Sequence, residues 1–253
     1  MTVNVLMADP PREGLVLSRL VETSPLDEAA AAGLYRAMFQ DLVSSAADSG
    51  GPTLVNYRPE DLLPDAYTTG ESVEAELRGY VEEVLPPEDA EAVRYEVQVG
   101  STYDARAGNT VTHLLEEEGE TSVAVLDPVA PLLARKDLDS AAMKLRQRDV
   151  VLGPGTGGEV HYAAFSDPID FAGAYTTPEL ETLTRRARDA GLDVDFVEEH
   201  VTVTTGDDLL SLLVHLRARR AAGRIVPEYT ATYLDSLDLR VRDGDDGPVL
   251  AQG

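Results

Sequence analysis

Apolar runs and amphipathic stretches alternate along this chain. The apolar runs predict short buried strands, and stretches with an apolar residue at every third or fourth position predict helices. The longest helical stretch, residues 26–47, has a helix start signal in Asp27, is rich in alanine and carries Leu34, Met38 and Leu42 at helical spacing. The predicted strands are residues 2–7, 53–57, 94–99, 122–126, 150–152 and 194–197, and the predicted helices are residues 26–47, 72–85, 110–118, 138–148, 178–190, 207–222 and 227–237.

Strands that are separated by helices need crossover connections, which make neighbouring strands parallel. The order of the elements therefore predicts an α/β fold in three layers, with a mostly parallel sheet covered by helices on both faces. No internal repeat and no long linker divides the chain. We expect residues 1–223 to form one domain and residues 224–253 to form a C-terminal extension packed on it, with a surface turn at 243–247.

The stretch 150–165, VVLGPGTGGEVHYAAF, places a glycine-rich segment between two apolar runs. Four glycines and one proline within residues 153–158 predict a loop, because glycine adopts backbone conformations that a Cβ atom forbids. Such a loop either turns the chain between two strands or lets backbone N–H groups approach a ligand, often a phosphate. The local sequence favours the turn.

The charge balance is strongly acidic. The 253 residues include 46 acidic and 21 basic side chains, a formal net charge of -25, while 43% of the residues are hydrophobic, as in an ordinary globular protein. The acidic residues are spread along the chain, and Lys136 and Lys144 are the only lysines. Carboxylates hold water and ions when salt is molar, and salt screens their mutual repulsion. This pattern predicts a cytoplasmic protein from a salt-in halophile rather than an acidic patch for a basic partner.

Composition also argues against several functions. Nucleic-acid binding needs clustered cations, and the one basic cluster lies at the end of a predicted helix, where cations complement the helix dipole. The absence of cysteine excludes disulfides, thiolate metal sites and cysteine nucleophiles. No 18-residue apolar run or signal-peptide pattern is present, so we expect no membrane contact. The basic cluster consists of Arg217, Arg219, Arg220 and Arg224.

Six segments carry a more specific pattern: PPREGLVLSRL, AAAAGLYRAMFQDLV, VAVLDPVAPLL, RDVVLGPGTGGEVHYAAF, AYTTPEL and VTVTTGDDLLSLL. In order and spacing they resemble the glycosyltransferase-A-like radical-SAM/selenodomain-associated transferases, distant relatives of molybdenum-cofactor and phospholactate guanylyltransferases. The resemblance extends over nearly the whole chain. It implies a three-layer α/β/α fold of the glycosyltransferase-A kind, also called the nucleotide-diphospho-sugar transferase fold, and a nucleotide or nucleotide-sugar as the ligand.

The resemblance assigns phosphate binding to the loop after the first strand, which in the family reads K-x-P-x-x-G-x-V-K-T-R-L. Here Asp9 and Leu17 stand at the two lysine positions. A carboxylate repels phosphate oxygens, so Asp9 removes much of the apparent purpose of this loop. Arg19 remains as a cation that either binds a phosphate or pairs with an acidic residue. The nucleotide-binding residues that the resemblance implies are Arg12, Gly14, Arg19, Gly153, Gly155 and Gly157.

Asp127 stands at the central aspartate of the family's D-x-P motif, at the end of a predicted strand. The resemblance implies that Asp127 holds Mg²⁺ or Mn²⁺ for a diphosphate leaving group. Alternatively, Asp127 caps the turn that begins at Pro128. The carboxylates of the family's D-G-G and D-V-D motifs are replaced by Gly157 and by Thr202 with Thr204. Hydroxyl groups bind Mg²⁺ much more weakly than carboxylates, so these replacements deplete the site.

Glu159 and His161 follow the glycine-rich loop and alternate, which predicts that one strand face carries both. Such a pair acts as a general base with its orienting group, or forms an exposed rim. His113, His200 and His215 are scattered, with no two at ligand spacing, which argues against a zinc site.

Two functions are compatible with this sequence. The lost charges favour a divergent nucleotide-sugar or nucleotidyl transferase-like protein with a depleted active site, which is catalytically impaired or only binds a ligand. The alternative is an active metal-dependent glycosyl- or nucleotidyltransferase that uses Asp127 and the 153–158 loop. A cluster of carboxylates around Asp127 in a cleft would favour the enzyme, whereas a cleft filled by Leu17 or other apolar side chains would count against it. The sequence assigns neither a catalytic residue nor an oligomeric state.

Overall fold

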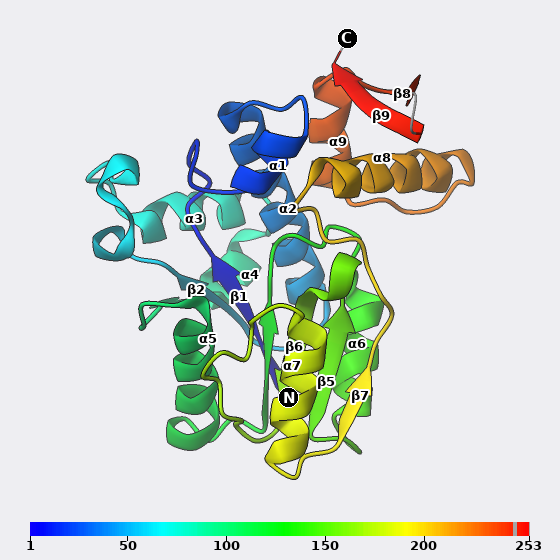
Figure 1. Ribbon diagram of the computed structural model, residues 1–253. Helices are drawn as coiled ribbons and strands as arrows, with labels where there is room; N and C mark the ends of the chain where they lie inside the picture. The colour runs from blue at the N-terminus through cyan, green and yellow to red at the C-terminus, as the bar shows by residue number, and fades with distance from the viewer. Residues whose placement is uncertain (245–246, 253) are drawn as a thin grey trace.

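The computed structural model describes residues 1–244 and 247–252 and contains a seven-stranded sheet in the order β3-β2-β1-β4-β6-β5-β7 (Figure 1). Neighbouring strands are parallel, except that β6 runs antiparallel to both β4 and β5. β6 is reversed because the loop that joins it to β5 is too short for a crossover helix. The predicted mostly parallel α/β fold is confirmed. The strands are β1 (Thr2–Ala8), β2 (Thr53–Tyr57), β3 (Arg94–Val97), β4 (Ser122–Leu126), β5 (Val150–Pro154), β6 (Val160–Phe165) and β7 (Val194–Phe196).

Helices cover both faces of the sheet, as the three-layer prediction requires (Figure 1). Apolar side chains of α2, α3 and α6 pack on one face, among them Phe39, Leu77 and Leu138. Side chains of α5 and α7, including Val111 and Leu183, pack on the other. The helices are α1 (Ser18–Thr23), α2 (Glu28–Asp48), α3 (Val73–Glu82), α4 (Pro87–Ala92), α5 (Tyr103–Thr112), α6 (Arg135–Lys144), α7 (Glu179–Asp189), α8 (Gly206–Ala221) and α9 (Glu228–Ser236).

A third apolar cluster joins the two ends of the chain. Leu20 of α1 and Leu34 of α2 pack with Leu209 of α8 and Leu234 of α9. The antiparallel hairpin of β8 (Leu239–Gly244) and β9 (Gly247–Gln252) adds its own apolar residues to this cluster. In Figure 1, α8, α9 and the hairpin gather at the upper right, close to α1. The domain boundary at residue 223 stays a prediction.

Most predicted elements lie within a few residues of their expected positions. Asp27 is the N-cap of α2, and its Oδ1 accepts a hydrogen bond from the Ala30 N–H at 2.8 Å. α1, α4 and the β8–β9 hairpin were not predicted. The predicted turn at 243–247 lies partly outside the described residues, because 245 and 246 are not among them. Within the described part of the chain, no helix is long and apolar enough to cross a membrane.

Three strands end side by side at the carboxyl edge of the sheet. The last residues of β1 and β2 are paired, and β4 runs parallel to β1 on its other side. The residues that follow these strands, Asp9, Arg58 and Asp127, therefore lie along one edge. The chain continues from β1 to β2 on one side while β4 lies on the other, and ligands of open α/β sheets bind at such a switch point.

Candidate functional site

Asp127 follows β4 directly and lies half-buried at the carboxyl edge. Its backbone N–H donates to the carbonyl of His161 at 3.0 Å. The pKa of Asp127 is raised to about 7, first by burial and then by the charges of nearby carboxylates, while a hydrogen bond from Tyr103 opposes the rise. These carboxylates belong to Glu179, Asp9 and Glu159. Three carboxyl groups therefore act on Asp127, although no group of three or more such side chains among the described residues is arranged to hold a metal ion.

Glu179, the first residue of α7, is the acidic neighbour with the strongest effect on Asp127. Its Oε2 accepts a hydrogen bond from the Val160 N–H at 2.9 Å, so the main chain of β6 holds this carboxyl group. Burial raises the pKa of Glu179 to about 7, and the charges of Glu159 and Asp104 contribute. Asp127 and Glu179 form a pair of carboxyl groups that titrates near neutral pH, mainly because burial disfavours the charged form of each.

Two tyrosines lie beside this carboxyl pair. Tyr103 begins α5, and its ring packs edge to face against Tyr175, with ring centroids 4.9 Å apart. The pKa of each tyrosine is raised by burial and by the charge of Asp127. Among the described residues the buried Tyr175 hydroxyl has no hydrogen-bond partner. The site therefore has a packed aromatic wall with one polar group left over.

Asp9 does not present a free carboxylate at the position where the family has lysine. Its Oδ2 accepts a hydrogen bond and ion pair from Arg58 Nη2 at 2.7 Å. Its backbone N–H donates to the Tyr35 hydroxyl at 3.1 Å. The pKa of Asp9 is raised by burial and lowered by Arg58 and by Arg106 of α5. Two arginines therefore offset the charge of Asp9.

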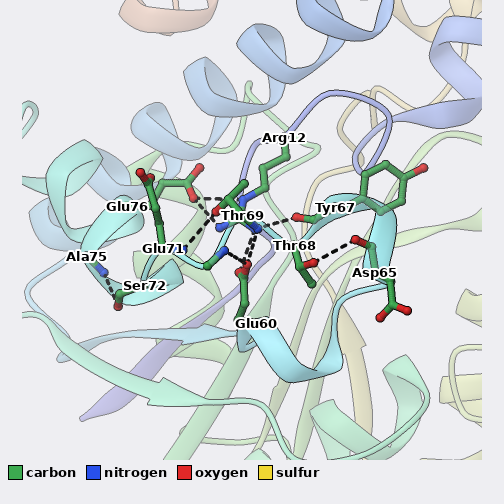
Figure 2. Close-up of polar contacts among 11 residues, drawn as sticks. Arg12, Glu60, Asp65, Tyr67, Thr68, Thr69, Glu71, Ser72, Ala75 and Glu76 are labelled. Carbon is green, nitrogen blue, oxygen red and sulfur yellow. Dashed lines mark hydrogen bonds and ion pairs between the residues drawn. The ribbon is translucent and has the colours of Figure 1, made fainter.

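Arg12, an expected phosphate ligand, is engaged by protein groups (Figure 2). Its Nη1 donates to Glu60 Oε2 at 2.8 Å and to the Tyr67 carbonyl at 2.7 Å, and its Nη2 donates to Glu76 Oε2 at 3.0 Å. The Arg12 side chain is only 10% exposed. Its guanidinium group links the 60–76 segment to the loop after β1, so its donors are already used within the protein.

The other two expected residues of this loop have different surroundings. Gly14 lies in the turn before α1 with a φ of 75°, and a Cβ atom at this position would lie 3.1 Å from Tyr67 Cε1. Arg19 is exposed on α1 and makes no side-chain hydrogen bond or ion pair with the described residues. Leu17 packs with the apolar clusters of α1 and α2, while carboxylates and tyrosines surround Asp127. Of the two expected arginines, Arg12 is paired, whereas the guanidinium group of Arg19 has no partner among the described residues.

The glycine-rich loop is explained by packing. A Cβ atom on Gly155 would lie 2.4 Å from Thr202 Cγ2, and one on Gly153 would lie 2.8 Å from His161 Cε1. Gly157 has a φ of 70° with no atom near its Cβ direction, as expected at a turn. The loop turns the chain between β5 and β6, which is the role that the local sequence favours. It also lies close to the segment before α8. Its predicted role in nucleotide binding stays a prediction.

The expected pairing of Glu159 with His161 is wrong. The β5–β6 ladder is irregular opposite Gly153, and His161 is buried against His200, with ring centroids 5.4 Å apart. Burial, followed by the charge of His200, lowers the pKa of His161 to about 3. Glu159 instead accepts a hydrogen bond from the Thr204 hydroxyl at 3.2 Å and contributes to the charge around Asp127. The bulge breaks the two-residue alternation on which the expectation rested.

Thr202 and Thr204 use their hydroxyl groups inside the protein. Thr202 Oγ1 accepts a hydrogen bond from the Thr156 N–H at 3.1 Å. Thr204 Oγ1 lies within 3.2 Å of oxygens of both Glu159 and Asp208. These positions therefore provide internal hydrogen bonds where the family has carboxylates.

Four residues of the site were missed from the sequence: Arg58, Tyr103, Arg106 and Glu179. Arg58 had a usable signal, because it directly follows a predicted strand in a parallel sheet. The N-terminal part of α5 was not predicted to be helical, since its polar sequence has weak helical periodicity. Glu179 lies within AYTTPEL, one of the six segments that carry the resemblance, but nothing in the local sequence indicates that this segment lies next to Asp127.

Comparisons with known proteins agree with this architecture. No protein-family model and no curated protein matches the chain. The solved structure of a candidate nucleotide-diphospho-sugar transferase from Desulfovibrio desulfuricans G20 is similar, with 20% identity and a TM-score of 0.73 over 94% of this chain and 96% of that one. A 4-diphosphocytidyl-2C-methyl-D-erythritol synthase from Anaerococcus prevotii DSM 20548 matches with 11% identity and a TM-score of 0.50, over 85% of this chain and 98% of its own. The chain has the nucleotide-diphospho-sugar transferase fold.

Proposed function

We propose that this protein is a metal-dependent transferase that binds a nucleotide or nucleotide-sugar at the carboxyl edge of its sheet. The carboxyl pair of Asp127 and Glu179 carries the proposal. The sequence favoured a depleted, impaired site, and the carboxylates around Asp127 shift the balance toward the active alternative. The substrate class comes from the fold and from the names of the similar structures.

The residues present fit Mg²⁺ or Mn²⁺. In phosphate-transfer sites Mg²⁺ is held by one or two carboxylates together with substrate phosphates and water, rather than by an all-protein cage. The described residues contain no group of three or more His, Asp or Glu side chains that could hold a metal ion. Asp127 and Glu179 supply the smaller donor set, and their raised pKa values mark a place where a cation relieves repulsion.

Each protein group has a role in this site. Asp127 and Glu179 would hold the cation, which when bound would supply charge neutralisation for a diphosphate leaving group. Tyr103 orients Asp127 through its hydrogen bond, and the Val160 N–H orients Glu179. Cation binding displaces the proton that the pair retains near pH 7.

Isothermal titration with nucleoside diphosphates, nucleoside triphosphates and nucleotide-sugars, with and without Mg²⁺ or Mn²⁺, tests the proposal. We expect at least one ligand to bind with micromolar affinity in a metal-dependent way, and Asp127→Asn to remove the metal-dependent part. Asp193→Asn is the matched control, because Asp193 is an exposed carboxylate paired with Arg188. Incubation of the bound ligand with metal, followed by detection of released phosphate, pyrophosphate or nucleoside phosphate, measures turnover.

A second candidate function is metal-independent ligand binding without catalysis. The internal hydrogen bonds of Thr202 and Thr204 favour it, because these positions offer no carboxylate to a second metal contact. Metal-independent binding without turnover, unchanged in Asp127→Asn, would replace the first proposal with the second. Absence of all binding by folded protein would remove both.

Two finer assignments accompany the proposal. We propose membership of the radical-SAM/selenodomain-associated transferase group, on the six segments described above. We also propose adaptation to molar salt in the cytoplasm of a halophile, on the net charge of -25. Unfolding midpoints that rise with KCl well beyond the concentration at which simple screening saturates would support the salt assignment.

A further inference from the structure

Arg58 and Arg106 both lie near Asp9 at the carboxyl edge. Arg58 directly follows β2, and its backbone N–H donates to the Ala8 carbonyl at 3.1 Å, which anchors it beside the end of β1. Its Nη2 donates to Asp9 Oδ2 at 2.7 Å. Arg106 lies in the first turn of α5, where its backbone N–H donates to the Thr102 carbonyl at 3.0 Å. Three elements distant in sequence therefore bring two cations to one carboxylate.

Arg106 lacks the partners that other partly buried charges have. Within residues 1–244 and 247–252, no carboxylate or carbonyl accepts a hydrogen bond from its guanidinium group, and its Nε is buried without a partner. The Nε of Arg58 is likewise buried and unpartnered. Burial lowers the pKa of Arg106, as does the like charge of Arg58, while Asp9 opposes this effect. Although the chain has 46 acidic residues, the guanidinium group of Arg106 keeps N–H donors that an external ligand can use.

The charges and donors of this group select its ligand. Two guanidinium groups and one carboxylate leave one net positive charge, with N–H donors still free. Guanidinium groups bind phosphate oxygens in a bidentate manner, and a partly buried site strengthens such contacts. Tyr103, whose ring lies 5.9 Å from the guanidinium carbon of Arg106, also hydrogen-bonds Asp127. The arginines thus lie next to the carboxyl pair.

We propose that Arg58 and Arg106 form a phosphate-binding site, in which Asp9 forms an ion pair with Arg58 while no ligand is bound. This inference rests on the proposed function in one respect, that the phosphate belongs to a nucleotide whose cation is held by Asp127 and Glu179. Ligand binding releases Arg58 from Asp9, so Asp9 competes with the phosphate and lowers its affinity. Free pyrophosphate has the same chemistry, and the test below separates the two sources.

The test measures binding of pyrophosphate without metal, then of nucleoside diphosphates with and without Mg²⁺, at a salt concentration where all variants are shown to be folded. We expect Arg106→Gln to weaken pyrophosphate binding about tenfold or more, because a charge-assisted bidentate contact is lost. We expect Asp9→Asn to strengthen it several-fold, because the competing carboxylate is removed. Arg146→Gln is the control: Arg146 is exposed and lines a separate cavity of about 650 Å³ with Thr2 and Ser122 at the opposite edge of the sheet.

The outcomes separate this inference from the proposed function. Equal affinities of Arg106→Gln and Arg146→Gln, weaker binding by Asp9→Asn, or no pyrophosphate binding by the unmodified protein would overturn the arginine site. Metal-dependent nucleotide binding that ignores Arg106 would leave the transferase proposal intact and remove this one. Arg106-dependent pyrophosphate binding without any metal-dependent nucleotide binding would support the arginine site and remove the transferase proposal. Nucleotide binding at least tenfold tighter than pyrophosphate binding, and equally sensitive to Arg106, identifies the nucleotide as the source of the phosphate.

Discussion

Two arginines at the carboxyl edge of this protein differ in almost every contact. Arg12 donates to two glutamates and a main-chain carbonyl and is nearly buried. Arg106 is partly buried and has no acceptor among the described residues, and its Nε is unpartnered. Buried polar groups in folded proteins are normally hydrogen-bonded. Arg12 therefore stabilises the protein, whereas Arg106 keeps donors free for a ligand, although the resemblance implied Arg12 and Arg19, and not Arg106, as nucleotide-binding residues.

The largest expected effect is on the Arg12 side of this comparison. Arg12→Ala leaves Glu60 and Glu76 without their cation and the Tyr67 carbonyl without its donor. We expect a loss of about 2 to 3 kcal/mol in the free energy of unfolding, since breaking a largely buried ion-pair network strands its other members. Urea unfolding at fixed salt measures it. A loss no larger than that of Arg106→Gln would contradict the distinction between the two arginines.

Asp127→Asn is expected to stabilise the protein at pH 8. The pKa of Asp127 is raised from 3.8 to about 7 in the folded state, so the unmodified protein loses stability as the pH rises from about 4 to 7. The amide carries no charge and lacks this loss, and we expect a gain of roughly 1 kcal/mol at pH 8 that vanishes near pH 4. Paired unfolding curves at both pH values measure the gain. A stability difference independent of pH would show that folding does not raise the pKa of Asp127.

Arg58→Gln is expected to destabilise the protein moderately. Asp9 keeps its partly buried carboxylate but loses its ion-pair partner at 2.7 Å, while Arg106 compensates in part. We expect a loss of about 1 kcal/mol at pH 8. The double variant Asp9→Asn with Arg58→Gln is the control, since the uncompensated charge is then absent. If the double variant is no more stable than Arg58→Gln, the Asp9–Arg58 pair has no role in stability.

The smallest expected effect is that of Arg106→Gln on stability without ligand. Arg106 lacks an acceptor and is repelled by Arg58, so its charge contributes little to the folded state. We expect a change within about 0.5 kcal/mol, in contrast with its large effect on pyrophosphate binding. Thermal unfolding with and without pyrophosphate measures both. A ligand-free loss comparable to that of Arg12→Ala would mean that Arg106 has a structural partner.

Local pattern was sufficient for the elements and for one part of the site. Asp127 was expected at the end of a buried strand and lies directly after β4. The glycine-rich loop was expected to turn the chain, and its glycines do so where a Cβ atom would collide with a neighbouring strand or loop. These features depend on residues close in sequence or on the pairing of two adjacent strands, so the local sequence pattern is enough to predict them.

Pairings between distant segments were not predictable in the same way. The bulge opposite Gly153 places His161 against His200 and away from Glu159. Arg12 is neutralised by Glu60 and Glu76, which lie 48 and 64 residues further along the chain. No local signal distinguishes these glutamates from the many other acidic residues of the sequence.

By itself, the sequence determined that strands and helices alternate, and hence that the sheet is mostly parallel and that Asp9 and Asp127 share its carboxyl edge. The tertiary structure decided which charges meet there: Arg58 and Arg106 beside Asp9, and Glu179 beside Asp127. The physical reason is range. Secondary structure follows from the periodic order of apolar residues, whereas electrostatic interaction falls off over a few ångströms and depends on packing that joins residues far apart in the chain.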